Sequence, residues 1–204
     1  MNLENLAHAD FPFNHWVFSN CLEEGALDEI SYSNIPSGDR MYDGTRAADH
    51  TGQGVDGKLR LFITKNNCQN FPYLTKLIQS LQSKEMVNKI SKIIDKDLSN
   101  SYVRLEVICD REGFWLKPHC DIEEKLMSSI VFVNLHNESE NLGTDFYDAE
   151  LNKVKTVPYK HNYGYFFTSG PNTWHGMEKK EIKKERRCIQ INYVTFETDW
   201  KVKS

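Results

Sequence analysis

The spacing of apolar residues changes once along this chain, near Asn100, and this change limits the folds that the chain can adopt. From Tyr73 to Leu98 apolar side chains recur every three or four residues, which predicts one amphipathic helix or two helices broken near Ser83. After Asn100 the period becomes two, in short runs rich in β-branched and aromatic residues. Helices followed by strands favour an α+β fold with a sandwich or barrel in the C-terminal half.

Six runs after Asn100 are predicted to be strands, because turn-forming residues separate them. They are Tyr102–Cys109, Trp115–Asp121, Ser128–Leu135, Thr144–Asp148, Tyr163–Thr168 and Arg186–Phe196. Upstream, His15–Phe18 is predicted to be a short strand, followed by a helix from about Glu23 with Asn20 as its N-terminal cap. The glycine-rich, polar stretch Ser37–Gly57 is predicted to be a long surface loop, either a plain connector or a lid over a site.

The composition predicts one soluble domain. The chain has 204 residues, of which 39% are hydrophobic, and its formal net charge of -4 provides no overall basic field for duplex nucleic acid or an anionic membrane. No apolar run approaches the roughly 20 residues that cross a bilayer, and no signal peptide is apparent, so a cytoplasmic protein is expected. Five cysteines without a C-x-x-C pair predict reduced thiols and no structural zinc site.

Four residues indicate a chemistry. His119 and Asp121 form an H-x-D pair, and residues two apart on a strand point to the same face. His175 follows a turn far downstream, and Arg186 opens the last predicted strand. Two histidines and one carboxylate on one face of iron leave three adjacent coordination positions open, as in non-haem Fe(II) oxygenases. A nearby arginine can hold the far carboxylate of a keto-acid co-substrate through two parallel hydrogen bonds.

Two adjacent arginines begin the last strand, and the alternation of its side chains distinguishes them. One face carries Arg186, Cys188, Gln190 and Asn192, and the other carries Arg187, Ile189, Ile191 and Tyr193. The first face is polar enough to line a site, whereas the second is suited to pack against helices with Arg187 at its edge. Arg186 is therefore the predicted site residue, and a change at Arg187 is expected to alter stability only modestly.

Five segments of the C-terminal half resemble the Fe(II)/2-oxoglutarate-dependent dioxygenases, in particular their small prolyl-hydroxylase-like branch. They are GFWLKPHCD, SSIVFVNL, LGTDFYD, NTWHGME and RRCIQINYV, within about Tyr102 to Tyr193. The resemblance implies a double-stranded β-helix, a cupin-like jelly roll, with supporting N-terminal helices. It implies a single domain over 1–204, in which 1–100 supply mainly helices and the glycine-rich loop and 101–196 form the jelly-roll core.

The same resemblance implies His119, Asp121 and His175 as iron ligands at the catalytic centre, and Arg186 as the anchor for 2-oxoglutarate. Cys188 departs from the pattern, because relatives usually have serine or threonine there, and Phe132 stands where relatives often have tyrosine. A hydroxyl for the co-substrate is expected from Ser128 or Tyr102 instead, beside Cys188. Since related halogenases lack the carboxylate, Asp121 favours hydroxylation or another oxidation.

The implied activity is an oxidation of an unactivated C–H bond by O2, with release of succinate and CO2 from 2-oxoglutarate and with ascorbate as a possible supporting reductant. A small molecule or a protein side chain is the expected substrate, and its pocket is expected to use Ser37–Gly57, Trp115, Asp145 and Tyr147. Two alternatives remain open. One is a non-catalytic metal-binding jelly roll, such as a sugar-binding or structural module; the other is a zinc hydrolase, because two histidines and an aspartate also suit zinc.

Overall fold

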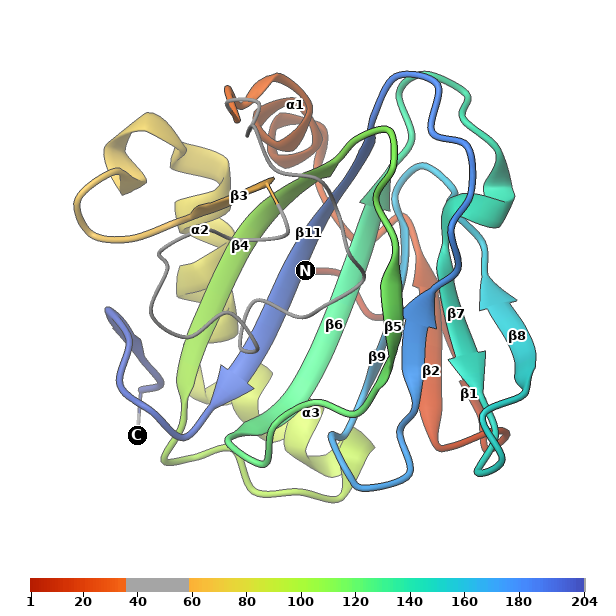
Figure 1. The fold of residues 1–204 in the computed structure, drawn as a ribbon. Helices are drawn as coiled ribbons and strands as arrows, with labels where there is room; N and C mark the ends of the chain where they lie inside the picture. Colours follow the sequence, from red (N-terminus) through yellow and green to blue (C-terminus); the bar gives the residue numbers. More distant parts are fainter. Residues whose placement is uncertain (36–58, 204) are drawn as a thin grey trace, which may run out of the picture.

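Two antiparallel sheets face each other in the computed structural model, which describes residues 1–35 and 59–203 (Figure 1). The larger sheet has the order β1-β2-β9-β6-β11-β4-β12, and β3 also pairs with β4. Its strands are β1 (Leu6–Ala9), β2 (His15–Ser19), β3 (Leu59–Phe62), β4 (Tyr102–Asp110), β6 (Lys125–Val133), β9 (Tyr163–Phe167), β11 (Arg186–Val194) and β12 (Trp200–Lys201). The smaller sheet comprises β5 (Leu116–His119), β10 (His175–Met177), β7 (Thr144–Tyr147) and β8 (Lys153–Val157), in that order.

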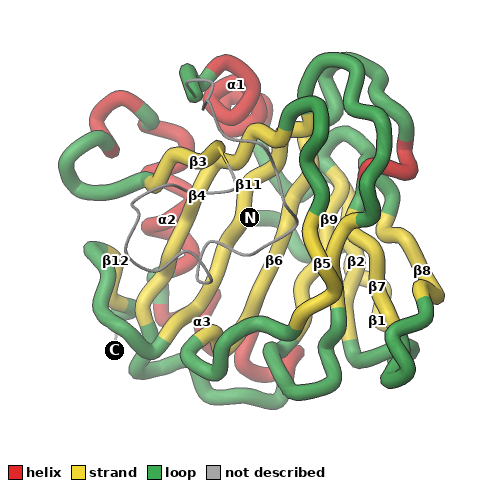
Figure 2. The backbone as a smooth tube through the Cα atoms, in the orientation of Figure 1, coloured by secondary structure: helices red, strands yellow, loops and turns green. Residues whose placement is uncertain are grey.

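Three helices cover the outer face of the larger sheet, behind β4, β11 and β6 as seen in Figure 2. They are α1 (Glu24–Tyr32), α2 (Pro72–Leu81) and α3 (Lys84–Ile94), and two short 3₁₀ turns span Cys68–Asn70 and Glu140–Leu142. The structure confirms the predicted α+β jelly roll with supporting helices. It also confirms the break at Ser83, whose hydroxyl accepts a hydrogen bond from the backbone N–H of Met86 at the start of α3. No helix among the described residues is long and apolar enough to cross a membrane.

The two faces of the larger sheet support separate cores. On the outer face, Val107, Val131 and Ile189 are fully buried against the apolar sides of the helices. On the inner face, Phe132 and Tyr165 pack with side chains of the smaller sheet. Because side chains alternate along each strand, the long strands β4, β6 and β11 contribute to both cores. No disulfide joins the five cysteines, all of which lie in the described part of the chain.

Several local predictions from the sequence were wrong or incomplete. The N-terminal cap of α1 is Glu23, whereas Asn20 has a left-handed backbone (φ 52°) in the preceding turn. Five short strands were not predicted, because their apolar residues do not alternate clearly. They are β1, β3, β8, β10 and β12. The jelly roll therefore takes β1, β2 and β3 from the first hundred residues as well as strands from 101–196. The loop predicted over Ser37–Gly57 lies outside the described residues.

Arg187 occupies a more important place than the sequence indicated. It is only 8% exposed, and its guanidinium donates hydrogen bonds to the carbonyl oxygens of Ile30 (2.9 Å) and Ser33 (2.8 Å). The same group donates to the carboxylate of Glu185 (2.6 Å). Because the carbonyls belong to the C-terminal end of α1, Arg187 ties this helix to β11 rather than lying at an exposed edge.

Arg187→Ala is expected to lower the free energy of unfolding by about 2 to 4 kcal/mol, because buried acceptors and the partly buried Glu185 would lose a charged donor. Urea unfolding followed by circular dichroism measures this change. Lys179→Ala, which removes an exposed cation, is the control and should change the value by less than about 0.5 kcal/mol. A loss below 1 kcal/mol for Arg187→Ala would contradict the anchoring role.

Candidate metal centre

The fold brings the two predicted histidine ligands together. His119 is the last residue of β5 and His175 is the first residue of β10, and these two strands pair with His119 opposite His175. Their ring centroids lie 4.4 Å apart. Asp121 follows β5 by two residues, and one ligand atom from each of the three side chains lies within 4.8 Å of the others. The spacing of these donor atoms is suitable for a single metal ion.

Backbone carbonyl groups orient both imidazole rings in the same way. Nδ1 of His119 lies 2.8 Å from the carbonyl oxygen of Lys117, and Nδ1 of His175 lies 2.9 Å from that of Thr173. Since a carbonyl only accepts, each Nδ1 carries the proton and each Nε2 presents its lone pair. Metal-binding histidines commonly have this second hydrogen bond, which orients the ring.

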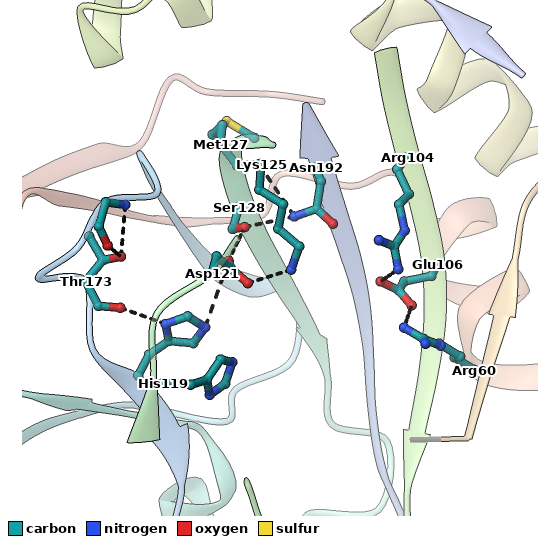
Figure 3. Close-up of polar contacts among 12 residues, drawn as sticks. Arg60, Arg104, Glu106, His119, Asp121, Lys125, Met127, Ser128, Thr173 and Asn192 are labelled. Carbon is teal, nitrogen blue, oxygen red and sulfur yellow. Dashed lines mark hydrogen bonds and ion pairs between the residues drawn. The ribbon is translucent and has the colours of Figure 1, made fainter. Parts of the chain in front are cut away.

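Asp121 is held as a carboxylate by its neighbours (Figure 3). Lys125 donates to Oδ1 (2.6 Å) and the hydroxyl of Ser128 donates to Oδ2 (2.5 Å). The side-chain amide of Asn192 donates to the same hydroxyl (2.9 Å), which completes a chain of hydrogen bonds from β11 to the metal centre. Burial alone would raise the pKa of Asp121, but the positive charge of Lys125 and the hydrogen bonds from Lys125 and Ser128 hold the pKa well below its usual value.

A cavity of about 320 Å³ adjoins the three ligands. Arg186 and Cys188 line it from β11, and Ile130 and Ser128 line it from β6. The alternation predicted for β11 is therefore observed: Arg186 faces this cavity, whereas Arg187 faces the helices. The cavity has the size of a small-molecule site.

The charge of Arg186 is balanced by Asp110, a residue that no pattern in the sequence indicated. Its Nη1 forms an ion pair with the buried carboxylate of Asp110, directly opposite on β4, and its Nε donates to the carbonyl oxygen of Leu142 (2.5 Å). The ring of Phe132 lies 5.2 Å below the guanidinium carbon. These contacts fix the plane of the guanidinium through its Nε and Nη1 atoms.

Two predicted hydroxyl donors are not placed for a co-substrate beside Arg186. Tyr102 pairs with Val194 at the other end of β4, eight residues from Asp110, or roughly 26 Å at 3.3 Å per residue. The hydroxyl of Ser128 lines the cavity but donates its proton to Asp121. Instead, Tyr165 and Thr144 line the cavity, and the hydroxyl of Tyr165 donates a hydrogen bond to that of Thr144 (2.9 Å). The sequence shows Tyr165 only as an alternating strand residue, so nothing distinguished it in advance.

The predicted substrate wall also differs from the one observed. Trp115, Asp145 and Tyr147 do not line the cavity, and Asp145 is fully buried in bonds to Thr156 and Lys180. The cavity wall includes three charged side chains that the sequence did not indicate, namely Arg60, Arg104 and Glu106 on β3 and β4.

Comparison with known proteins identifies the fold. No protein-family profile and no curated protein sequence matches this chain. Among solved structures, a prolyl 4-hydroxylase from Phytophthora capsici is similar with a TM-score of 0.62 and 13% identity, over 91% of this chain and 60% of that one. A Trichoplax adhaerens prolyl hydroxylase, in complex with a hypoxia-inducible-factor peptide fragment, has a TM-score of 0.58 and 18% identity, over 89% of this chain and 83% of that one.

A Pseudomonas putida prolyl-4-hydroxylase is similar over 69% of this chain and 72% of that one, with a TM-score of 0.51 and 13% identity. The chain has the fold of the prolyl-hydroxylase-like Fe(II)/2-oxoglutarate oxygenases. At 13 to 18% identity this likeness establishes the oxygenase fold, as the resemblance in sequence had implied, and leaves the reaction to be argued from the site.

Each of His119→Ala, His175→Ala and Asp121→Ala is expected to weaken Mn(II) or Fe(II) binding by about 100-fold or more, because the site would keep only two ligands. Ser128→Ala, which removes a bond to a ligand, is expected to weaken binding on the order of 10-fold. Metal titration followed by calorimetry measures both effects, and circular dichroism checks that the fold is retained. Wild-type affinity in His119→Ala would show that the metal lies elsewhere.

Proposed function

We propose that this protein is a non-haem Fe(II)- and 2-oxoglutarate-dependent dioxygenase that oxidises an unactivated C–H bond. The observation that supports this proposal is the placement of a two-histidine, one-carboxylate group and a buried arginine in the same cavity. The three ligands suit Fe(II) with open coordination positions, and Arg186 suits the distal carboxylate of a keto acid. The shared fold supports the same proposal.

His119, His175 and Asp121 would hold the iron with their Nε2 and carboxylate oxygen atoms. Lys125 and Ser128 keep the carboxylate ionised and oriented, so that Asp121 needs no rearrangement of charge when the metal binds. When bound, the iron and 2-oxoglutarate would supply the oxidising chemistry with O2, and the protein would orient them in the cavity. Ascorbate is a proposed supporting reductant.

Arg186 would bind the distal carboxylate of 2-oxoglutarate in the cavity, whose wall also includes Tyr165 and Thr144. Asp110 keeps the guanidinium fixed in place, so binding would cost little side-chain entropy. Tyr165 and Thr144 are the proposed hydroxyl donors in place of Ser128 and Tyr102, and the small thiol of Cys188 leaves room beside them.

The alternatives gain no support from the cavity. A zinc hydrolase needs a general base beside the metal-bound water. Among the described lining residues, Glu106 is the acidic side chain besides Asp121, and it is engaged by the guanidinium groups of Arg60 and Arg104. A structural or sugar-binding module would not require the buried Arg186–Asp110 pair, since an isosteric apolar pair would be as stable.

The purified protein is expected to convert 2-oxoglutarate to succinate slowly with Fe(II) and ascorbate, even before its substrate is known. The reaction is expected to stop when EDTA removes the metal and in His119→Ala. Succinate measured by mass spectrometry tests this, with heat-denatured protein as the control. No metal-dependent succinate above that control would contradict the proposed function.

Removal of the charge pair Arg186–Asp110 is expected to weaken 2-oxoglutarate binding by roughly 30-fold to several hundred-fold, because a charge-assisted bidentate bond is lost. The double change Arg186→Leu with Asp110→Asn is used, since Arg186→Ala alone would leave a buried unpaired carboxylate. Arg186→Lys should be intermediate, because an ammonium keeps the charge without the planar fork. Calorimetry with Mn(II)-loaded protein measures the affinity independently of turnover. Unchanged affinity in the double variant would exclude Arg186 as the anchor.

A further inference from the structure

The two oxygen atoms of the Asp121 carboxylate have different neighbours (Figure 3). Oδ1 accepts a hydrogen bond from the ammonium group of Lys125 at 2.6 Å, whereas Oδ2 accepts one from the hydroxyl of Ser128 at 2.5 Å. Oδ2 also lies 4.0 Å from Nε2 of His175. The oxygen beside the histidine therefore meets a neutral donor, and the other oxygen is bonded to a full positive charge.

A further hydrogen bond sets the direction of the bond from Ser128. Nδ2 of Asn192, a fully buried residue, donates to Oγ of Ser128 at 2.9 Å. This bond uses a lone pair of the hydroxyl, so its single proton is directed to Oδ2 of Asp121. A carboxylate oxygen has two lone pairs, and Ser128 uses one of them. Oδ2 thus keeps a lone pair for a metal ion.

The backbone around Lys125 holds its side chain beside Oδ1. Its N–H donates to the carbonyl oxygen of Ile122 at 3.1 Å, which closes the turn between Asp121 and β6. Lys125 is also paired with Val194 of β11. Its side chain is 14% exposed and lines the cavity at the metal centre. The ammonium group is therefore part of the cavity wall rather than a surface charge.

The charge of Lys125 disfavours a second metal–oxygen bond from Asp121. A carboxylate binds a cation through one oxygen or through both. Binding through both would place a divalent ion about 2.1 Å from Oδ1, which already lies 2.6 Å from the ammonium nitrogen. Two cations on one oxygen repel each other strongly where water screens them little, and the Asp121 side chain is only 5% exposed. Binding through Oδ2 alone avoids this repulsion.

The number of metal–oxygen bonds decides how many coordination positions remain. In a six-coordinate site, two histidines and one carboxylate oxygen leave three positions open. A keto acid that chelates through two oxygens would use two of them, and one would remain for O2. If Asp121 bound through both oxygens, it would occupy this last position.

We propose that Lys125 is a positioning residue that limits Asp121 to one metal–oxygen bond, through Oδ2, and so keeps one coordination position open for O2. This inference rests on the proposed function and adds to it a residue that acts through Asp121 rather than on the substrate. An ion pair that only oriented the carboxylate or only stabilised the fold would have different consequences for the binding of the metal and of O2.

Lys125→Met tests this role, because methionine keeps the length of the side chain and removes its charge. Mn(II), titrated by calorimetry, is expected to bind this variant as tightly as the wild type or up to about 10-fold more tightly, since Asp121 gains a second bond and a nearby cation is lost. A residue that only orients Asp121 would behave like Ser128, whose replacement by alanine is expected to weaken metal binding. Circular dichroism checks the fold, and Lys125→Gln, which is also uncharged, replaces the variant if it does not fold.

Nitric oxide is the probe for the O2 position. It is titrated without oxygen into protein loaded with Fe(II) and N-oxalylglycine, an isostere of 2-oxoglutarate, and its binding is followed by electron paramagnetic resonance. Lys125→Met is expected to bind nitric oxide at least about 10-fold more weakly than the wild type, whereas its affinity for N-oxalylglycine changes by less than about 3-fold. Lys125→Arg, which keeps the charge, should restore most of the affinity for nitric oxide. Lys179→Met, which removes an exposed cation, is the control and should bind nitric oxide like the wild type.

Wild-type affinity for nitric oxide in Lys125→Met would overturn the inference, and so would weaker binding of Mn(II) by this variant, because Lys125 would then only orient Asp121. Failure of the proposed function gives a different result. In that case the wild type itself would form no metal-dependent succinate and would not bind N-oxalylglycine. If the wild type does both and Lys125→Met binds nitric oxide as tightly as the wild type, only the role of Lys125 is wrong.

Discussion

The antiparallel pairing of β11 with both β4 and β6 is the constraint on which the rest of the site depends. It places Arg186 opposite Asp110 and Asn192 opposite both Arg104 and Ser128. A shift of one residue would turn every side chain of β11 to the other face. The cationic side chain inside the cavity would then be Arg187, and the helices would lose the buried residue that holds α1. The deep apolar core on both faces makes such a shift very unfavourable.

With β11 in this register, the charged side chains at the cavity form three separate groups of ion pairs. Asp121 has Lys125 and Ser128, Arg186 has Asp110, and Glu106 lies between two arginines. Each buried charge therefore has a partner, which reduces the cost of removing it from water. The proposed roles of two groups follow from this division, since the first would hold the metal and the second the co-substrate.

Much of the fold could be predicted because the signals are local and strong. The step from a period of 3.6 to a period of two marks the helices and the long strands. The short strands β8 and β10 have no such signal, since their pairing with β7 holds them in place. Tyr102, predicted to bind the co-substrate, lies at the end of β4 that is remote from Arg186, for a related reason. Alternation identifies the face of a strand on which a side chain lies, but it contains no information about which end of the strand is near the metal.

The sequence by itself determined the donor atoms and the faces on which they lie. His119 and Asp121 share a face because they are two residues apart, and Arg186 separates from Arg187 by the same alternation. Only the tertiary structure decided the charge environment. Asp110, Lys125, Arg60 and Glu106 reach their partners through strand pairing and chain turns that no local pattern encodes. The physical reason is that side-chain periodicity depends on the backbone of one strand, whereas an ion pair across strands depends on the order and register of the whole sheet.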